Sequence, residues 1–301
     1  MKNLLSIESL TGDEIRTIVD DAVSLKANRN DFSRQPLAHQ CWAMIFAKSS
    51  TRTRVSFEVG VRELGGSVMF LSANDIQLGR GEPIKDTARV MGRMLHGAII
   101  RTYAQQDVED FAEYSGIPTI NALTDDEHPC QILADLLTIR ERIGGWEGKR
   151  IAFFGDGACN MGRSWAWAAA RLGFELVVAA PDGYQLDDKF METLPSEAKV
   201  ILTANAKDAA EGADVLYTDT WVSMGREDEQ AQRRVALQPF QVNENLMSLA
   251  NEGAIVQHCL PAYREYEITE GLLESNAEAI FQQAENRLHA QKAVLANLAK
   301  T

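Results

Sequence analysis

The sequence alternates twice between short apolar segments and amphipathic ones, and this alternation restricts the chain to a narrow set of folds. The first series contains four apolar segments with strand character, at residues 42–47, 67–71, 98–103 and 118–123. The second series contains five, at residues 150–154, 175–180, 200–203, 214–218 and 254–257. Segments of helical character lie between them, at residues 57–64, 85–95, 128–143, 161–172 and 243–249. Strands that alternate with helices build parallel sheets, so the pattern predicts an α/β fold of two doubly wound parallel-sheet domains.

Both ends of the sequence are predicted to be helical. Near the N-terminus Thr11 and Glu14 form a capping box, and apolar residues follow at helical spacing. The segment 282–299 has the same periodicity. The boundary between the two series falls in the long helix near residues 135–148, and 301 residues is a length typical of two domains. Ligands of open parallel sheets bind beyond the carboxyl ends of the strands, where we expect the functional residues.

Charge and cysteine content exclude several classes of function. A formal net charge of −13 argues against binding to nucleic acid or to an anionic membrane. The N-terminal segment has neither signal-peptide nor transit-peptide character, and no apolar run is long enough to span a bilayer. The four cysteines stand far apart without a C-x-x-C pair, at positions 41, 130, 159 and 259. They predict reduced thiols in a cytoplasm rather than a disulfide scaffold or a zinc knuckle.

A hydroxyl- and arginine-rich segment, Ser50-Thr51-Arg52-Thr53-Arg54, lies where a predicted strand gives way to a helix. The first amides of a helix lack backbone acceptors, and the helix dipole adds partial positive charge there. Two guanidiniums and several hydroxyls at such a position suit a phosphate dianion. The alternative is a solvated helix cap with surface arginines.

A second candidate segment, His128-Pro129-Cys130-Gln131, also stands at a helix start. Pro129 suits the first helical turn and leaves His128 just outside it. The imidazole and the Gln131 amide are donors for a polarised carbonyl group. The alternative is a structural histidine.

Two further segments follow predicted strands in the second series. Residues 219–225 (DTWVSMG) offer a carboxylate, Asp219, for a cationic amine, and residues 258–261 (HCLP) offer the Cys259 thiol. The alternatives are a plain turn and an inert buried thiol. The polar stretch that follows residue 225 and runs to about residue 241 lacks an apolar period and predicts a mobile loop.

The glycine-containing segment 155–160 (GDGACN) stands between a strand and a helix and invites comparison with a dinucleotide-binding fingerprint. Asn160 occupies the position of the third glycine, while Asp182 lies where a ribose-binding acid is expected. A nicotinamide-dependent dehydrogenase is therefore an alternative from another class.

Taken together, these segments resemble the aspartate/ornithine transcarbamoylase family along almost the whole chain. The matching segments are collinear, in the order FAKSSTRTRVSFE, QLGRGEPIKDTARV, IIRTY, DDEHPCQILAD, GDGACNM, DTWVSMG, HCLPA and AENRLHAQKAVL. The DTWVSMG segment is similar to that of the ornithine-specific members. The aspartate-specific members carry arginine-rich acceptor contacts there and a lysine in the loop where this chain has Gln77.

The resemblance implies a domain organisation and a set of ligand contacts. Residues 1–134 with the returning C-terminal helix 282–301 would bind carbamoyl phosphate, and residues 135–281 would bind ornithine, with long helices joining the two domains. The implied carbamoyl phosphate contacts are Ser50, Thr51, Arg52, Thr53, Gln77 from a neighbouring subunit, Arg101, His128, Gln131 and Arg287. The implied ornithine contacts are Asn160, Asp219, Ser223, Met224, Cys259 and Leu260, with a cis peptide between Leu260 and Pro261.

The implied reaction is transfer of the carbamoyl group to the δ-amine of ornithine, giving citrulline and phosphate. The residues implied to be catalytic are Arg101, His128, Asp219 and Cys259. No metal and no organic cofactor is expected, because the phosphate leaving group is already activated. The resemblance also implies a cytoplasmic homotrimer. Within the family the alternative acceptors are putrescine or an acylated ornithine, and outside enzymology the alternative is an inactive relative that serves as a binding protein.

Overall fold

The structure, a computed structural model, describes residues 1–31, 33–72, 81–222 and 227–300. The chain divides into two compact units: unit 1 contains Met1–Leu137 and Glu285–Thr301, and unit 2 contains Thr138–Ala284. Each unit is built on one sheet whose paired strands all run parallel. The predicted fold class, two parallel-sheet α/β domains, is therefore confirmed. Among the described residues, no helix combines the length and the apolar character that crossing a membrane requires.

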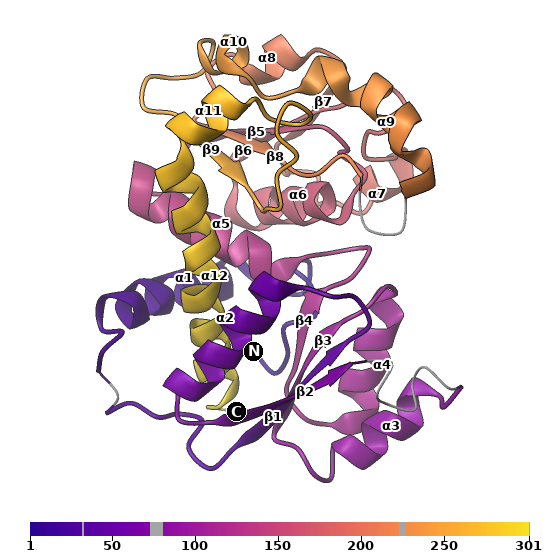
Figure 1. Cartoon of the computed structure of the whole chain (residues 1–301), viewed down its shortest axis with the longest axis vertical. Helices are drawn as coiled ribbons and strands as arrows, with labels where there is room; N and C mark the ends of the chain where they lie inside the picture. The colour runs from indigo at the N-terminus through magenta and orange to yellow at the C-terminus, as the bar shows by residue number, and fades with distance from the viewer. Residues whose placement is uncertain (32, 73–80, 223–226, 301) are drawn as a thin grey trace. The chain divides into compact units, whose positions relative to one another are not determined.

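Unit 1 contains a four-stranded sheet with the order β2-β1-β3-β4. The strands are β1 (Cys41–Phe46), β2 (Ser67–Ser72), β3 (Gly97–Arg101) and β4 (Thr119–Leu123). The helices that belong wholly to this unit are α1 (Gly12–Ala27), α2 (Thr51–Glu63), α3 (Ile84–Met91) and α4 (Gln105–Ser115). Figure 1 shows α3 and α4 on one side of the sheet and α2 on the other. Side chains alternate along β1, and Ala43 and Ile45 pack with Phe111 of α4 in one buried cluster.

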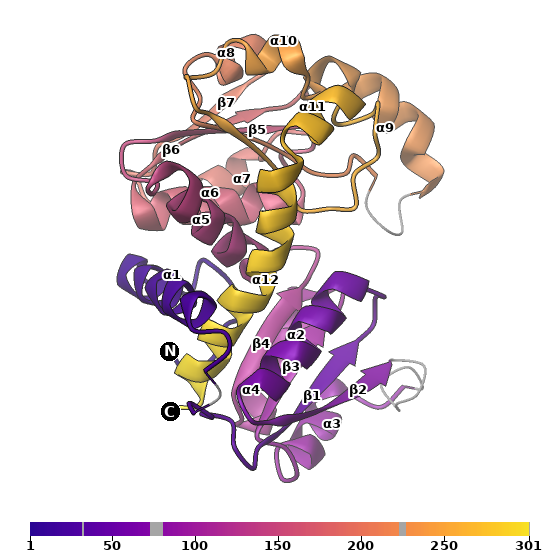
Figure 2. The same cartoon turned by 60° about the vertical axis from the view of Figure 1, so that its left-hand side comes forward.

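Unit 2 contains a five-stranded sheet with the order β7-β6-β5-β8-β9. The strands are β5 (Arg150–Phe154), β6 (Glu175–Ala179), β7 (Val200–Thr203), β8 (Val215–Thr218) and β9 (Ile255–His258). The helices are α6 (Asn160–Leu172), α7 (Asp188–Met191), α8 (Ala206–Ala210), α9 (Gln230–Leu237), α10 (Glu244–Met247) and α11 (Glu270–Ser275), with 3₁₀ turns η2 (Glu227–Glu229) and η3 (Gln238–Phe240). In Figures 1 and 2, α8, α10 and α11 lie on one side of this sheet and α6 lies on the other.

Two long helices belong to both units, because the boundaries between the units fall inside α5 (Pro129–Ile143) and α12 (Ala277–Leu298). The last part of α12 returns to unit 1, as predicted. There Asn286 accepts a hydrogen bond from Lys26 of α1 at 2.7 Å, and Lys292 pairs with Glu63 of α2 at 2.7 Å. The C-terminal helix therefore completes the first unit.

One local prediction was wrong. The stretch up to residue 241 was predicted to be a mobile loop, but its described part, from residue 227 to 240, forms η2, α9 and η3 in succession. The face of α9 that turns inward carries Arg233 and Leu237. A buried arginine does not register in an apolar period, so the sequence pattern concealed this helix.

Candidate active site

In unit 1, the predicted phosphate-binding segment lies at the start of α2, as expected. Ser50 has an extended backbone and caps the helix, because its Oγ accepts a hydrogen bond from the Thr53 amide at 3.3 Å. The same hydroxyl donates to the Thr53 Oγ1 at 2.9 Å. Thr53 is buried, whereas Arg52 is half-buried and Thr51 is exposed. The helix start therefore presents hydroxyls and a guanidinium next to the first amide groups of the helix.

Two more polar residues stand beside this helix start because neighbouring strands end there. Arg101 is the last residue of β3 and lies in register with Phe46, the last residue of β1. His128 immediately precedes α5, and both Arg101 and His128 are buried. Burial, followed by the charges of Arg287 and Arg101, holds the pKa of His128 well below its ordinary value. The imidazole is therefore neutral near pH 7.

Arg287 of α12 connects these elements. Its guanidinium is buried and donates to the Gln131 Oε1 at 2.6 Å and to the Thr53 Oγ1 at 3.1 Å. Two buried guanidiniums with the α2 amides make a site for a compact anion. We call this set the basic cluster; it contains Ser50, Thr53, Arg101, His128, Gln131 and Arg287.

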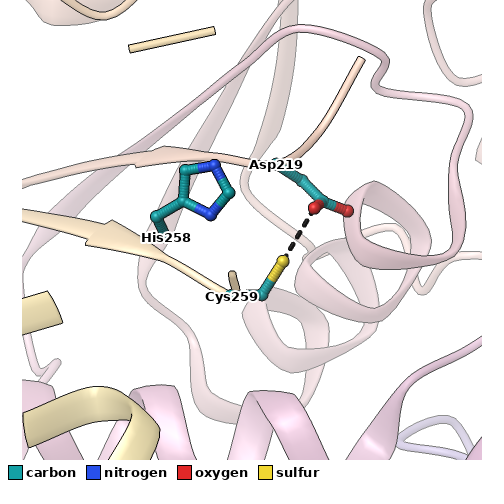
Figure 3. A group of neighbouring side chains, drawn as sticks. All are labelled: Asp219, His258 and Cys259. Atoms are coloured by element: carbon teal, nitrogen blue, oxygen red, sulfur yellow. Dashed lines mark hydrogen bonds between the residues drawn. The ribbon is translucent and has the colours of Figure 1, made fainter. Parts of the chain in front are cut away.

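In unit 2, Asp219 and Cys259 follow adjacent strands, because Thr218 of β8 and His258 of β9 are in register. The Cys259 Sγ donates to the Asp219 Oδ1 at 2.7 Å (Figure 3). The Thr220 amide donates to the same oxygen at 2.6 Å. Burial is the largest cause that raises the pKa of Asp219, while His258 and the two hydrogen bonds oppose it. The carboxylate is thus partly desolvated and held beside a thiol.

His258 supports this pair from the buried side. Its Nδ1 accepts from the Leu260 amide at 2.8 Å, and its Nε2 lies 3.1 Å from the Glu267 Oε1. Leu260 adopts a left-handed backbone, and the bond from Leu260 to Pro261 is cis, as predicted. We call Asp219, His258, Cys259 and Glu267 the Asp219 cluster.

Close packing around the start of α6 explains why glycines stand there. A Cβ on Gly157 would lie 2.4 Å from the Val178 Cγ1, and a Cβ on Gly162 would lie 2.0 Å from the Gly157 carbonyl oxygen. Asn160 is the first residue of α6 and follows this turn. The Cys159 thiol has a strongly raised pKa because of burial and of the charges of Asp156 and Asp219. The turn therefore lies beside the Asp219 cluster.

Comparisons with known proteins decide the family. The profile described as "Aspartate/ornithine carbamoyltransferase, carbamoyl-P binding domain" matches residues 2–141, and the profile described as "Aspartate/ornithine carbamoyltransferase, Asp/Orn binding domain" matches residues 147–298. The chain belongs to the aspartate/ornithine carbamoyltransferase family. The predicted family is thereby confirmed.

Individual members of this family match over almost their full length. The ornithine carbamoyltransferase of Akkermansia muciniphila is 61% identical over 301 residues, covering 99% of this chain and 98% of the relative. That of Methanosphaera stadtmanae is 49% identical, covering 100% of both chains. The crystal structure of anabolic ornithine carbamoyltransferase from Campylobacter jejuni matches with a TM-score of 0.93 at 42% identity, covering 100% of this chain and 99% of that one.

The Asp219 cluster also has the composition of a metal site. Single ligand atoms of Asp219, His258 and Cys259 all lie within 4.8 Å of one another. Both ring nitrogens of His258 are already engaged, however, by Leu260 and by Glu267. Asp219 and Cys259 are thus joined to each other by a hydrogen bond, whereas the ring nitrogens of His258 contact Leu260 and Glu267.

Sequence reasoning missed several buried charged residues of this carbamoyltransferase, among them Lys48 and Glu267. Lys48 forms an ion pair with Asp125, and its ammonium lies 4.2 Å from the ring centroid of Tyr103. Glu267 accepts hydrogen bonds in the Asp219 cluster. Lys48 stands two residues before the helix cap, so its position next to the predicted phosphate-binding segment could have indicated it. Glu267 lies in a polar stretch of the sequence that gives no such indication.

The predicted contacts Gln77, Ser223 and Met224 lie outside the residues that the structure describes. The other predicted contacts divide between the two units. Those of unit 1 are Ser50, Thr51, Arg52, Thr53, Arg101, His128, Gln131 and Arg287, and those of unit 2 are Asn160, Asp219, Cys259 and Leu260.

Proposed function

We propose that this chain transfers the carbamoyl group of carbamoyl phosphate to the δ-amine of L-ornithine, giving L-citrulline and phosphate. The observation that carries the proposal is the hydrogen bond between Cys259 and Asp219 in unit 2. In the same chain, unit 1 has buried guanidiniums beside the start of a helix. The relatives named above, which carry ornithine carbamoyltransferase as their name, support this acceptor.

Carbamoyl phosphate is assigned to the basic cluster. The phosphate dianion binds at the start of α2, where residues 50–53 offer amides, hydroxyls and the Arg52 guanidinium, and Gln77 of a neighbouring subunit adds an amide. Arg287 orients Thr53 and Gln131, because it donates to both side chains. Charge-assisted hydrogen bonds of this kind are each worth about 1.5–3 kcal/mol.

The carbonyl oxygen of the same substrate is assigned to Thr53, Arg101 and His128. Attack on the carbonyl carbon places negative charge on this oxygen, and fixed donors stabilise it. A neutral His128 is suited to the task, because it donates an N–H group without adding a third cation beside the two arginines. Removal of one oxyanion donor typically lowers turnover by about 10²–10³.

Ornithine is assigned to the Asp219 cluster together with Asn160, Ser223, Met224 and Leu260. Its δ-ammonium resembles that of lysine, with a pKa of about 10.4, so it must lose a proton before it attacks. Burial raises the pKa of Asp219, but a carboxylate is a poor base for an alkyl ammonium, so we assign it the role of orienting the amine together with the Cys259 thiol. The chemistry requires no metal or organic cofactor, since phosphate is an activated leaving group.

A citrulline assay with carbamoyl phosphate and ornithine tests the proposal directly, and a panel with putrescine and acylated ornithines tests the acceptor. We expect turnover with unmodified ornithine and background rates with the others. Ornithine turnover near background, with turnover of another amine, would assign the chain to that amine instead.

Two variants test the assignment of the substrates. Arg52→Ala should abolish carbamoyl phosphate binding in calorimetry, because the principal phosphate cation is lost, and Asp219→Asn should retain that binding but lose ornithine turnover. Arg54→Ala is the matched control, because Arg54 lies over the Phe70 ring, 3.9 Å from its centroid, and should bind carbamoyl phosphate normally. Normal turnover of ornithine by Asp219→Asn would refute the acceptor assignment.

The assembly and the location of the protein are further parts of the proposal. We infer a homotrimer, or a multiple of trimers, in which Gln77 of one subunit serves the basic cluster of the next. Four cysteines without a disulfide among them suit a reducing cytoplasm.

A further inference from the structure

We propose that Arg233 is a positioning residue that fixes the Asp219 cluster and the start of α6 in one arrangement, and thereby sets the affinity for the acceptor amine. The inference rests on the proposed function and concerns a residue to which neither the sequence motifs nor the family resemblance assigns a role. Arg233 lies on α9, one of the helices that sequence patterning did not predict.

The guanidinium of Arg233 is buried, with a side chain 4% exposed, and it joins two loops that follow adjacent strands. Its Nε donates to the carbonyl oxygen of Trp221 at 2.6 Å, two residues after Asp219. Its Nη2 donates to the carboxylate of Asp156, whose side chain is 9% exposed. Phe154 of β5 and Thr218 of β8 are in register, so these two loops leave the sheet side by side.

On the Asp156 side, the contact extends to the start of α6. The Oδ1 of Asp156 accepts from the Ala158 amide at 3.2 Å, and the Ala158 amide also lies 3.1 Å from the Tyr184 carbonyl oxygen. The ring of Tyr184 in turn lies beneath the Arg233 guanidinium, 5.0 Å from its carbon to the ring centroid. Asp156 therefore holds the turn that leads to Asn160.

On the Trp221 side, the backbone is fixed from two directions. The indole is 2% exposed and packs against the bare backbone of Gly155, where an added Cβ would lie 3.2 Å from the indole Nε1. The carbonyl group of the same residue accepts the bond from Arg233. Asp219 is thereby attached to a short segment whose position depends on Arg233.

The planar guanidinium is essential to this role. It donates in two directions at once, to a neutral carbonyl and to a carboxylate, while its face covers an aromatic ring. A lysine ammonium at the same position can neutralise Asp156, but it cannot hold the Trp221 carbonyl in the same geometry. Arg234, the next residue, makes none of these three contacts; it lies over the Tyr266 ring, 3.7 Å from the centroid.

Steady-state kinetics of Arg233→Lys and Arg233→Ala test the inference, with Arg234→Ala as the matched control. We expect the KM for ornithine to rise at least about tenfold in Arg233→Lys and further in Arg233→Ala, with the dissociation constant of carbamoyl phosphate within about twofold of the original. The control should leave both constants within about twofold. An unchanged KM for ornithine in folded Arg233→Lys, or equal losses for both substrates, would overturn the inference.

A second measurement covers the case in which Arg233→Ala does not fold. The effects of Asp156→Asn and Arg233→Lys on the KM for ornithine should combine to less than their product in the double variant, because both changes act through the same guanidinium. Multiplying effects would show independent residues and overturn the inference. The original chain separates this result from the proposed function. If the original chain forms no citrulline, the proposed function itself fails. If it forms citrulline and the variants keep its KM for ornithine, only the role of Arg233 is rejected.

Discussion

His128 illustrates, at the scale of single residues, how burial selects a protonation state. The folded chain keeps its imidazole neutral, whereas an unfolded chain protonates it near pH 6.5. Between these two pKa values the unfolded state binds more protons, so the free energy of unfolding decreases as the pH falls below about 6.5, by up to about 1.4 kcal/mol per pH unit. At higher pH this contribution is fully present.

We therefore predict that His128→Asn weakens the acid sensitivity of the folded state. Urea denaturation at neutral pH and at about pH 5.5 should show a smaller loss of unfolding free energy in the variant than in the original chain. His289, whose pKa is also lowered, contributes equally to both proteins and cancels in the comparison. Identical pH slopes would show that His128 titrates normally in the fold.

Residues of the site differ in how much of their role the sequence reveals. Ser50 and Thr53 were predictable, because a cap and its third residue are fixed by local spacing, and the structure contains that bond. Asp156 and Arg233 are 77 positions apart and form a buried ion pair. Such a pairing arises from the order of the strands in the sheet, which no local pattern contains.

At the scale of elements, α6 shows a conflict between helix propensity and packing. Alanine is favoured over glycine inside a helix by about 1 kcal/mol. At Gly162 the added Cβ would lie 2.0 Å from the Gly157 carbonyl oxygen, which forces the turn before α6 to move.

We predict that Gly162→Ala destabilises the protein, by about 1–3 kcal/mol as is typical of overpacking. The matched control is Gly60→Ala in α2, where the new Cβ meets the flexible Lys292 Cγ at 3.3 Å. Thermal unfolding of both variants measures the difference, and we expect the control to stay close to the original midpoint. A Gly162→Ala variant as stable as the original would contradict the close approach described here.

The elements themselves were predicted where their pattern was periodic. All nine strands of the two sheets lie at the predicted segments, within a residue or two at their ends. The helices α4, α7, α8, α9 and α11 were not predicted, since they are short or polar and their burial depends on neighbours in the sheet order. Tertiary contacts, rather than local propensity, stabilise helices of this length.

At the scale of the whole molecule, the proposed trimer has a consequence for mixed assemblies. If Gln77 serves the site of a neighbouring subunit, Arg52→Ala and Gln77→Ala inactivate the same site from two different chains. Random reassembly of the two inactive proteins in equal amounts should then restore about a quarter of the original activity, because that share of sites receives both intact residues.

Citrulline formation after mixed refolding measures this recovery, and each variant refolded alone is the control. Light scattering should give about 100 kDa for a trimer of 33.3 kDa chains. Recovery that does not exceed the controls would place Gln77 in its own subunit's site.

The discontinuity of unit 1 also affects how the protein matures during translation. Residues 138–284 form a contiguous stretch that is synthesised before Arg287. Domains generally fold as units, so the half of the enzyme that carries Asp219 has its whole chain before the other half receives its final helix. If Arg287 contacts carbamoyl phosphate as proposed, a chain that ends before this residue is unable to bind that reactive mixed anhydride, and such partial products of translation are inert.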